Sequence, residues 1–589
     1  MTTAHPVMSR AWLKGRAWLL GGAWLCLTCM LGTHAQTSRN YTTVTFSDGR
    51  QLRGEVTHIP GAASTSSVAR FLGVQYGASP TGARRYSQPE LEPSWSGLRD
   101  ALTFGPRCVQ SLSDWDDQSE NCLNLNIFSP SLNSSNPVMV WFHGGGWRVG
   151  SSSDDIFDGT SLASRGVVVV TVNYRLGPLG FLTTGDDVMP GNYGMLDQVL
   201  ALRWVRDNIR SFGGDPNSVT IFGESAGAAS CSLHVLSPLS RGLFHRAIME
   251  SGSSFNLWGT ERPGSAAKLD NLTRQIGERV GCRYITSESF LACLRNVSAR
   301  NLLEATLSLR AQLRIEIPLT PRVERRFGFL PDYPKRLLES GSFNRVDTLR
   351  GYNSGEYSYF INDPENDGLT RQEFATSFER FFSKYPVQGH AHDFLVQFIG
   401  ANYLGNNTNP ITIRSNLVTA FADTGFGLGS ILELQKMLEH GGASNSHYVY
   451  EADYQTSLSN HPAWMGVLHG GELSLVFMNT SPIPSFFQSP TDRAVGEKVQ
   501  ALWSNFARTG NPVATRVAEN GGEVRWGRYT LAGPTVLRID ARSSEISFPR
   551  PESLRAYDQF LNILQVNNPT VPGTTSATSL PQGTVQTGG

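Results

Sequence analysis

Residues 223–227 read GESAG, directly after the apolar run 218–222 and before a stretch of small residues that favours a helix. When a strand enters a tight turn and leaves it as a helix, the central side chain is lifted above the sheet. Glycines flank that side chain because a Cβ at either position would clash with neighbouring strands. The pattern therefore predicts that Ser225 is a nucleophile. The structural alternative is a serine that only caps a helix.

A second motif, VMVWFHGGGW at residues 138–147, places three glycines after an apolar strand. A nucleophilic serine needs donors for the oxyanion of a tetrahedral intermediate, and consecutive glycines let backbone N–H groups approach that oxygen closely. We expect Gly145, Gly146 and Ala226 to supply these N–H groups, whereas the alternative is a flexible turn. Trp147 and Glu224 lie within the two motifs and are candidates for the wall of a substrate pocket.

A serine hydroxyl is almost un-ionised at neutral pH, so Ser225 needs a general base, and the base needs an orienting carboxylate. Chains with this serine motif carry the acid and then the histidine further along. His469 lies in the glycine-flanked segment 464–472 and is the best-placed base, with His461 and His447 as alternatives. Glu356 follows an apolar strand, at the carboxyl end where α/β folds keep their sites, and is the predicted acid.

The fold class follows from apolar runs that alternate with helical patterns. The runs are residues 138–142, 167–172, 218–222, 246–249, 348–352 and 447–450. Continuous β-branched runs separated by helices, such as 194–209, predict a mostly parallel sheet covered by helices on both faces. Residues 275–338 and 370–438 read as helical insertions over a pocket. No linker interrupts residues 42–564, so the chain is expected to hold one large domain, residues 36–565.

The two ends of the chain differ in composition from this domain. Residues 1–35 combine basic residues, an apolar stretch and a small-residue site, which predicts a signal peptide, with a membrane anchor as the alternative. We expect no other run to be long and apolar enough to cross a bilayer. Residues 566–589 are polar and predict a disordered tail without the hydrophobic signal of a lipid anchor. The protein is therefore predicted to be secreted.

In a secreted protein, sequons can be glycosylated and cysteines can form disulfides. The N-x-[ST] sequons begin at Asn40, Asn133, Asn271, Asn296, Asn406 and Asn479, and several should be glycosylated at the surface. Of the seven cysteines, two leave with the signal peptide. Cys108 with Cys122 and Cys282 with Cys293 are close pairs that would clip short loops, which leaves Cys231 as a buried free thiol.

Charge and ligand spacing argue against other partners. Fifty basic and fifty acidic residues give a net charge of zero, with no basic run long enough to hold nucleic acid. No cluster of histidine and cysteine has metal-ligand spacing, so neither a metal nor an organic cofactor is predicted. A small-molecule ester is the expected partner, and the oligomeric state cannot be read from one chain.

Five sequence blocks, in order, resemble the type-B carboxylesterase/cholinesterase family of α/β-hydrolases over roughly residues 42–565. The blocks are residues 119–126, 144–146, 173–181, 208–215 and 222–227. The resemblance implies an α/β-hydrolase fold, a triad of Ser225, Glu356 and His469, and disulfides that join Cys108 to Cys122 and Cys282 to Cys293. Because all three triad positions are filled, the family's non-catalytic adhesion members match poorly.

The resemblance leaves the ester class open. Trp258 would line the acyl side, and Tyr359 and Phe360 offer aromatic faces either to a quaternary ammonium or to any bulky ester. Three departures from cholinesterases favour a general carboxylesterase: a short loop between Cys108 and Cys122 whose Trp115 has the wrong offset, His143 in place of a tyrosine, and Arg148 in place of an aromatic residue. A choline ester hydrolase, a lipase-like esterase and a secreted adhesion protein with incidental activity are the alternatives.

Overall fold

The computed structural model describes residues 40–59, 67–111, 114–263, 266–314, 317, 319–385, 389–478, 489–519 and 521–566. The predicted signal peptide and Asn479 lie outside these ranges, as does the predicted tail beyond residue 566. The structural statements below concern the described residues.

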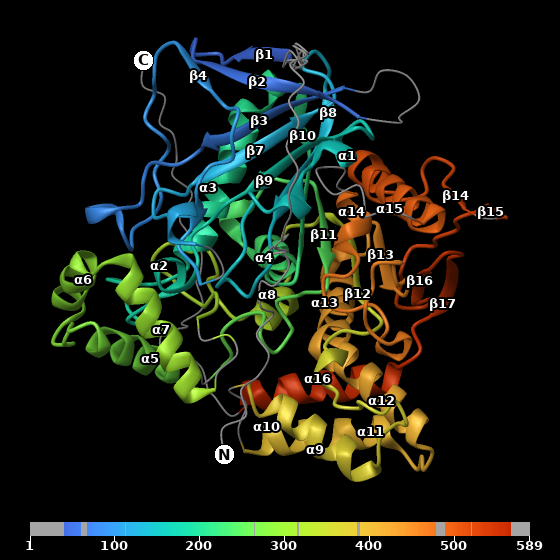
Figure 1. The fold of residues 1–589 in the computed structure, drawn as a ribbon. Coiled ribbons are helices and arrows are strands. Elements are labelled where there is room, and N and C mark those ends of the chain that lie inside the picture. Colours follow the sequence, from blue (N-terminus) through green and yellow to red (C-terminus); the bar gives the residue numbers. More distant parts are fainter. Residues whose placement is uncertain are drawn as a thin grey trace, which may run out of the picture. The chain divides into compact units, whose positions relative to one another are not determined.

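A 13-stranded mixed sheet runs in the order β1-β2-β3-β7-β9-β8-β10-β11-β12-β13-β16-β17, with β4 paired to β2 (Figure 1). Its strands are β1 (Asn40–Thr45), β2 (Gln51–His58), β3 (Ser67–Gln75), β4 (Leu98–Asp100), β7 (Asn124–Ser129), β8 (Asn136–Phe142), β9 (Val168–Val172), β10 (Gly214–Glu224), β11 (Arg246–Glu250), β12 (Asp347–Asn353), β13 (His447–Ala452), β16 (Thr535–Ile539) and β17 (Ser544–Ser547). Neighbours from β9 to β16 are parallel. The expected α/β architecture with a mostly parallel sheet is thus confirmed, and antiparallel strands that the sequence analysis missed extend both edges.

Two small strand pairs and the helices complete the fold. The pairs are β5 (Arg107–Cys108) with β6 (Gln118–Ser119) and β14 (Ala518–Glu519) with β15 (Gly522–Glu523). The helices are α1 (Thr160–Ala163), α2 (Gly177–Phe181), α3 (Tyr193–Asn208), α4 (Ala226–Leu236), α5 (Ala266–Arg279), α6 (Ser287–Asn296), α7 (Ala299–Leu313), α8 (Pro334–Glu339), α9 (Arg371–Phe382), α10 (His390–Asp393), α11 (Gly400–Leu404), α12 (Pro410–Ala422), α13 (Leu428–Met437), α14 (Leu473–Phe477), α15 (Pro490–Thr509) and α16 (Pro551–Val566).

The alternation of side chains along β8 divides the core into two layers. Val138, Val140 and Phe142 join the hydrophobic cluster that includes α3 and α4. Met139 and Trp141 join the cluster on the other face, which includes α1, α14 and α15. Because successive side chains of a strand point to opposite faces, one apolar run supplies both layers and is buried throughout. The sheet therefore forms a rigid base for the loops at the carboxyl ends of its strands.

The predicted helical insertions correspond to α5–α8 and α9–α13. Of these, α5–α7 and α9–α11 lie away from the sheet in Figure 1. Within the second, α12 and α13 belong to one long helix, Pro410–Gly442, with a π-helical turn at Asp423–Gly427. Its length and mean hydropathy of 1.3 are those of a membrane span, so the expectation that no such run exists was wrong. In the fold, 94% of that window is buried, which is how a core helix of a globular protein behaves.

Candidate active site

The chain forms the turn that GESAG predicts, between the end of β10 and the start of α4. Ser225 has φ 56° and ψ −123°, a conformation that a non-glycine residue rarely adopts. A Cβ on Gly223 would lie 2.6 Å from the Phe142 carbonyl oxygen, and one on Gly227 only 1.9 Å from it. Glycine is required at both positions because the turn packs directly on β8. The strain is typical of a residue that is held in place for function.

The structure brings Ser225, His469 and Glu356 together in one hydrogen-bonded series. His469 Nε2 lies 2.9 Å from Ser225 Oγ, and His469 Nδ1 lies 2.7 Å from Glu356 Oε2. Glu356 is fully buried, and its Oε1 accepts a hydrogen bond from the backbone N–H of Asn353 at 3.0 Å. With the Nδ1 proton donated to Glu356, Nε2 is left to accept the proton of the serine hydroxyl.

The two alternative histidines do not join this series. His447 is buried in β13, where its ring nitrogens lie 2.8 Å from Thr348 Oγ1 and 2.9 Å from the Gly442 carbonyl oxygen. His461 is part of an exposed segment, 3.4 Å from the Pro462 carbonyl oxygen. Of the three candidate bases, only His469 contacts Ser225 among the described residues.

Buried carboxyl groups surround the imidazole. Glu224 Oε1 lies 3.2 Å from His469 Nε2. Burial by itself lowers the pKa of His469, but the charges of Glu224 and Glu356 outweigh burial and raise that pKa above its ordinary value. Burial likewise raises the pKa of Glu224 to about 7. The site thus stabilises an imidazolium, the form that the histidine takes when it accepts a proton.

Glu472 and Glu250 extend this cluster and were missed from the sequence. Glu472 accepts a hydrogen bond from the Asn353 side chain, so Asn353 joins Glu472 to Glu356. Burial, together with the charges of Glu224 and Glu356, raises the pKa of Glu472 to about 8. Glu250 accepts from Trp503 Nε1 at 2.8 Å, and burial raises its pKa well above the usual range. Burial thus favours the neutral form of both groups.

The glycine loop lies against Ser225 as the sequence suggests. A Cβ on Gly144 would lie 3.1 Å from the Cβ of Ser225, and Gly145 and Gly146 have φ of +101° and +64°. Burial lowers the pKa of the preceding His143 to about 4, so this residue is neutral, and its ring stacks on Tyr174 at 4.5 Å. On the other side of the serine, Ala226 is the first residue of α4, where backbone N–H groups lack helical partners. The glycine loop and the start of α4 therefore both adjoin Ser225.

An aromatic wall adjoins these groups. The rings of Trp147 and Trp258 are 6.2 Å apart and both are buried, whereas Tyr359 and Phe360 are 48% and 40% exposed. Phe426, on the π-helical turn, lies 4.6 Å from the His469 ring and 5.5 Å from Trp258. Phe426 was missed because it is distant in sequence, although glycines on both sides of a phenylalanine within a helix were a usable signal.

Trp115 is not positioned as an open cation-binding face, because the guanidinium of Arg300 lies over its ring at 4.3 Å.

Both predicted disulfides, Cys108–Cys122 and Cys282–Cys293, are present, and Cys231 is buried and free. The described sequon asparagines are all exposed: Asn40, Asn133, Asn271, Asn296 and Asn406. In the described part of the chain, no group of three or more His, Cys, Asp or Glu side chains is arranged to hold a metal ion.

The position of Glu224 gives a prediction for the pH dependence of activity. In Glu224→Gln, loss of the carboxylate beside Nε2 lowers the pKa of His469, because an imidazolium is no longer stabilised. The base must be neutral to accept a proton, so the acidic limb of kcat/KM should move to lower pH by about 1 unit. The plateau should also fall, because the transition state contains the imidazolium. A pH profile of the two proteins checks this, and a limb that stays in place or moves upward contradicts it.

Comparison with known proteins places this geometry in a family. A model described as "Carboxylesterase family" matches residues 40–556. Carboxylesterase 1D of Mus musculus is 36% identical over 502 residues, which cover 79% of this chain and 84% of that protein. Cocaine esterase of Homo sapiens is 34% identical over 490 residues, with 78% and 82% covered. Neuroligin-3 of Mus musculus is 33% identical over 585 residues, with 87% and 68% covered. Since the family model spans most of the chain and these relatives align along most of it, the protein belongs to the carboxylesterase family.

Proposed function

We propose that this protein is a secreted serine hydrolase of carboxylic esters that works through an acyl-enzyme. The observation that carries the proposal is the hydrogen-bonded series from Ser225 through His469 to Glu356. Membership of a family with relatives named as esterases supports it.

In the proposed reaction, Ser225 Oγ attacks the acyl carbonyl while its proton passes to His469 Nε2. Glu356 keeps the imidazole in the required tautomer and stabilises its charged form. The N–H groups of Gly145, Gly146 and Ala226 hold the oxyanion of the tetrahedral intermediate. The imidazolium then protonates the leaving alcohol. A water molecule, deprotonated by His469, attacks the acyl-enzyme, which releases the acid and restores Ser225.

Secretion is part of the proposal. Two disulfides are typical of proteins that fold in an oxidising compartment. The exposure of the described sequons supports glycosylation at these sites. A signal peptide at residues 1–35 and a hydrolase domain at residues 36–565 complete the proposed organisation.

The expected substrates are neutral esters rather than choline esters. A quaternary ammonium needs an aromatic face that no other cation occupies. Lys384 Nζ lies 3.7 Å from the centroid of the Phe360 ring, and Arg300 lies over Trp115. Positive charges at these rings oppose a cationic leaving group.

The test is to measure kcat/KM of the purified protein on two butyryl esters of matched size, one with a choline leaving group and one neutral, with Ser225→Ala alongside. We expect the neutral ester to react at least as fast. A choline preference above ~10-fold, about 1.4 kcal/mol in the transition state, would favour a cholinesterase-like enzyme. Absence of Ser225-dependent turnover on either ester would refute the hydrolase and favour a recognition protein.

A further inference from the structure

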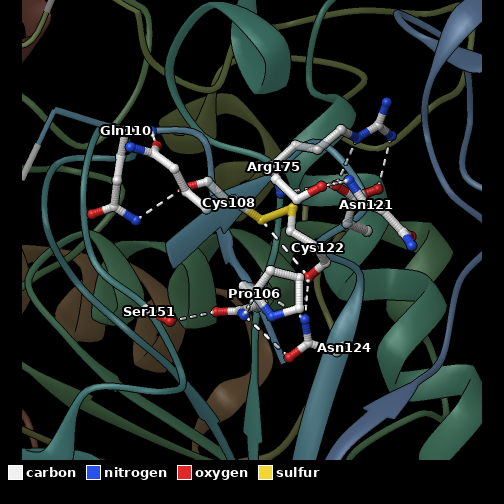
Figure 2. The surroundings of a disulfide bond; sticks show 12 residues. Pro106, Cys108, Gln110, Asn121, Cys122, Asn124, Ser151 and Arg175 are labelled. Carbon is white, nitrogen blue, oxygen red and sulfur yellow. Dashed lines mark hydrogen bonds and ion pairs between the residues drawn. A yellow bond between two sulfur atoms is a disulfide. The ribbon is translucent and has the colours of Figure 1, made fainter. Parts of the chain in front are cut away.

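The loop that carries Gly145 and Gly146 is tied at its far end to the Cys108–Cys122 disulfide. The link is Gln110, whose side chain is buried. Its Oε1 accepts the backbone N–H of Gly150 at 2.9 Å, and its Nε2 donates to the Gly150 carbonyl at 2.8 Å. Nε2 also donates to the Cys108 carbonyl at 3.1 Å. One side chain thus satisfies both backbone groups of Gly150 and connects them to the Cys108 carbonyl. Figure 2 shows Gln110 near the Cys108–Cys122 disulfide.

Gly150 in turn packs on the start of the glycine loop. It has φ +109°, and a Cβ there would lie 2.5 Å from His143 Nδ1 and 2.7 Å from the Gly144 carbonyl oxygen. Between these two ends the loop closes as a turn, since the Gly145 carbonyl accepts the N–H groups of residues 148 and 149 at 3.1 and 3.2 Å. Because this turn is hydrogen-bonded and closely packed, a shift of the Gly150 backbone would change the orientation of the Gly145 and Gly146 N–H groups.

Asn173 connects the residues that follow the loop, Ser151 and Ser152, to the backbone just before Cys108. Asn173 Oδ1 accepts from Ser151 Oγ at 3.1 Å and from the backbone N–H of Ser152 at 2.8 Å. Its Nδ2 donates to the Pro106 carbonyl at 3.2 Å, two residues before Cys108 (Figure 2). Gln110 and Asn173 therefore support the loop and its continuation at residues 150, 151 and 152. Of these contacts, the two hydrogen bonds between Gln110 and Gly150 are the ones nearest to Gly145 and Gly146 in sequence.

We propose that Gln110 is a positioning residue for ester hydrolysis: it holds the oxyanion-binding loop through Gly150, and the Cys108–Cys122 disulfide fixes Gln110 itself. The inference rests on the hydrolase function proposed above. Gln110 touches no reacting atom and acts only through the placement of backbone donors. Those donors meet full negative charge only in the transition state, so their displacement lowers kcat and leaves KM nearly unchanged.

The kinetic test compares Gln110→Ala and Gln110→Glu with the wild type on a neutral ester. In Gln110→Ala we expect kcat to fall by about 10- to 100-fold, with KM within about twofold. Gln110→Glu keeps an acceptor for the Gly150 N–H but sets a carboxylate oxygen against the carbonyls of Gly150 and Cys108, so its kcat should fall at least as far as that of Gln110→Ala. Affinity for a trifluoromethyl ketone, whose adduct with the serine carries an oxyanion, should fall in parallel with kcat.

The two disulfides provide a matched control. Replacement of Cys108 and Cys122 together by serine should give the same signature of lowered kcat and steady KM. Replacement of Cys282 and Cys293, which join the segment after α5 to α6, should leave kcat near the wild-type value. If Gln110→Ala does not fold, Gln110→Glu and the two cysteine pairs carry the test.

The outcomes separate this inference from the hydrolase function. Unchanged kcat in Gln110→Ala, a loss that falls on KM alone, or equal losses in both cysteine pairs would overturn the positioning role while the hydrolase stands. A wild-type protein without Ser225-dependent turnover would overturn both.

Discussion

Ser225→Ala is expected to lower kcat by at least ~10³-fold, because no other group can form the acyl-enzyme. The hydroxyl that is lost lies 2.9 Å from His469 Nε2, and alanine differs from serine only by the absence of that hydroxyl. Folding should therefore be preserved, and the loss should appear in turnover alone. The measurement is steady-state hydrolysis of a neutral ester, with thermal unfolding recorded for both proteins.

Ser251→Ala is a matched control for this substitution. Ser251 follows β11, the neighbour of β10, and is also buried with a positive φ of 53°. Its replacement should leave kcat within about 10-fold of the wild type, because Ser251 is not part of the triad. His469→Ala should match Ser225→Ala, and the double variant should be no slower than either, because residues of a triad act as a unit. Retention of most activity in His469→Ala would disprove its role as the base.

Local sequence explains why the serine turn, the acid and the base could be predicted together. Gly223 and Gly227 are required by contacts with the adjacent strand, so the motif and its backbone shape are inseparable. Parallel strands end at one edge of a sheet, which brings Ser225 and Glu356 to the same side from strands far apart in the chain. The glycines around His469 marked a loop that presents a side chain.

Other parts of the site depend on packing that no short pattern specifies. Phe426 reaches the imidazole from a π-helical turn in an insertion, and Gln110 reaches Gly150 through a disulfide-closed loop. Each contact joins two segments that are far apart in sequence and come together only in the tertiary structure, so a local sequence pattern does not reveal it. The antiparallel strands β1 and β2 were missed for a related reason, because they are partly exposed and lack the continuous apolar runs of the buried strands.

Glu356→Gln is expected to lower kcat by about 10⁴-fold, the effect known for the equivalent change in a serine protease triad. The backbone N–H of Asn353 donates to Oε1 at 3.0 Å, which favours the amide oxygen of glutamine at that position. The amide NH₂ then faces His469 Nδ1, which must accept a hydrogen bond instead of donating one. The proton moves to Nε2, and this nitrogen can no longer accept the proton of Ser225.

Two variants separate this tautomer effect from a general loss of buried charge. Glu356→Asp keeps a carboxylate and should recover part of the lost activity. Glu472→Gln makes the same carboxyl-to-amide change beside Asn353, without a hydrogen bond to the imidazole, and should lower kcat by less than about 10-fold, because burial already favours the neutral form of Glu472. Equal losses in Glu356→Gln and Glu472→Gln would mean that the cluster acts as a whole and that Glu356 has no special part in orienting His469.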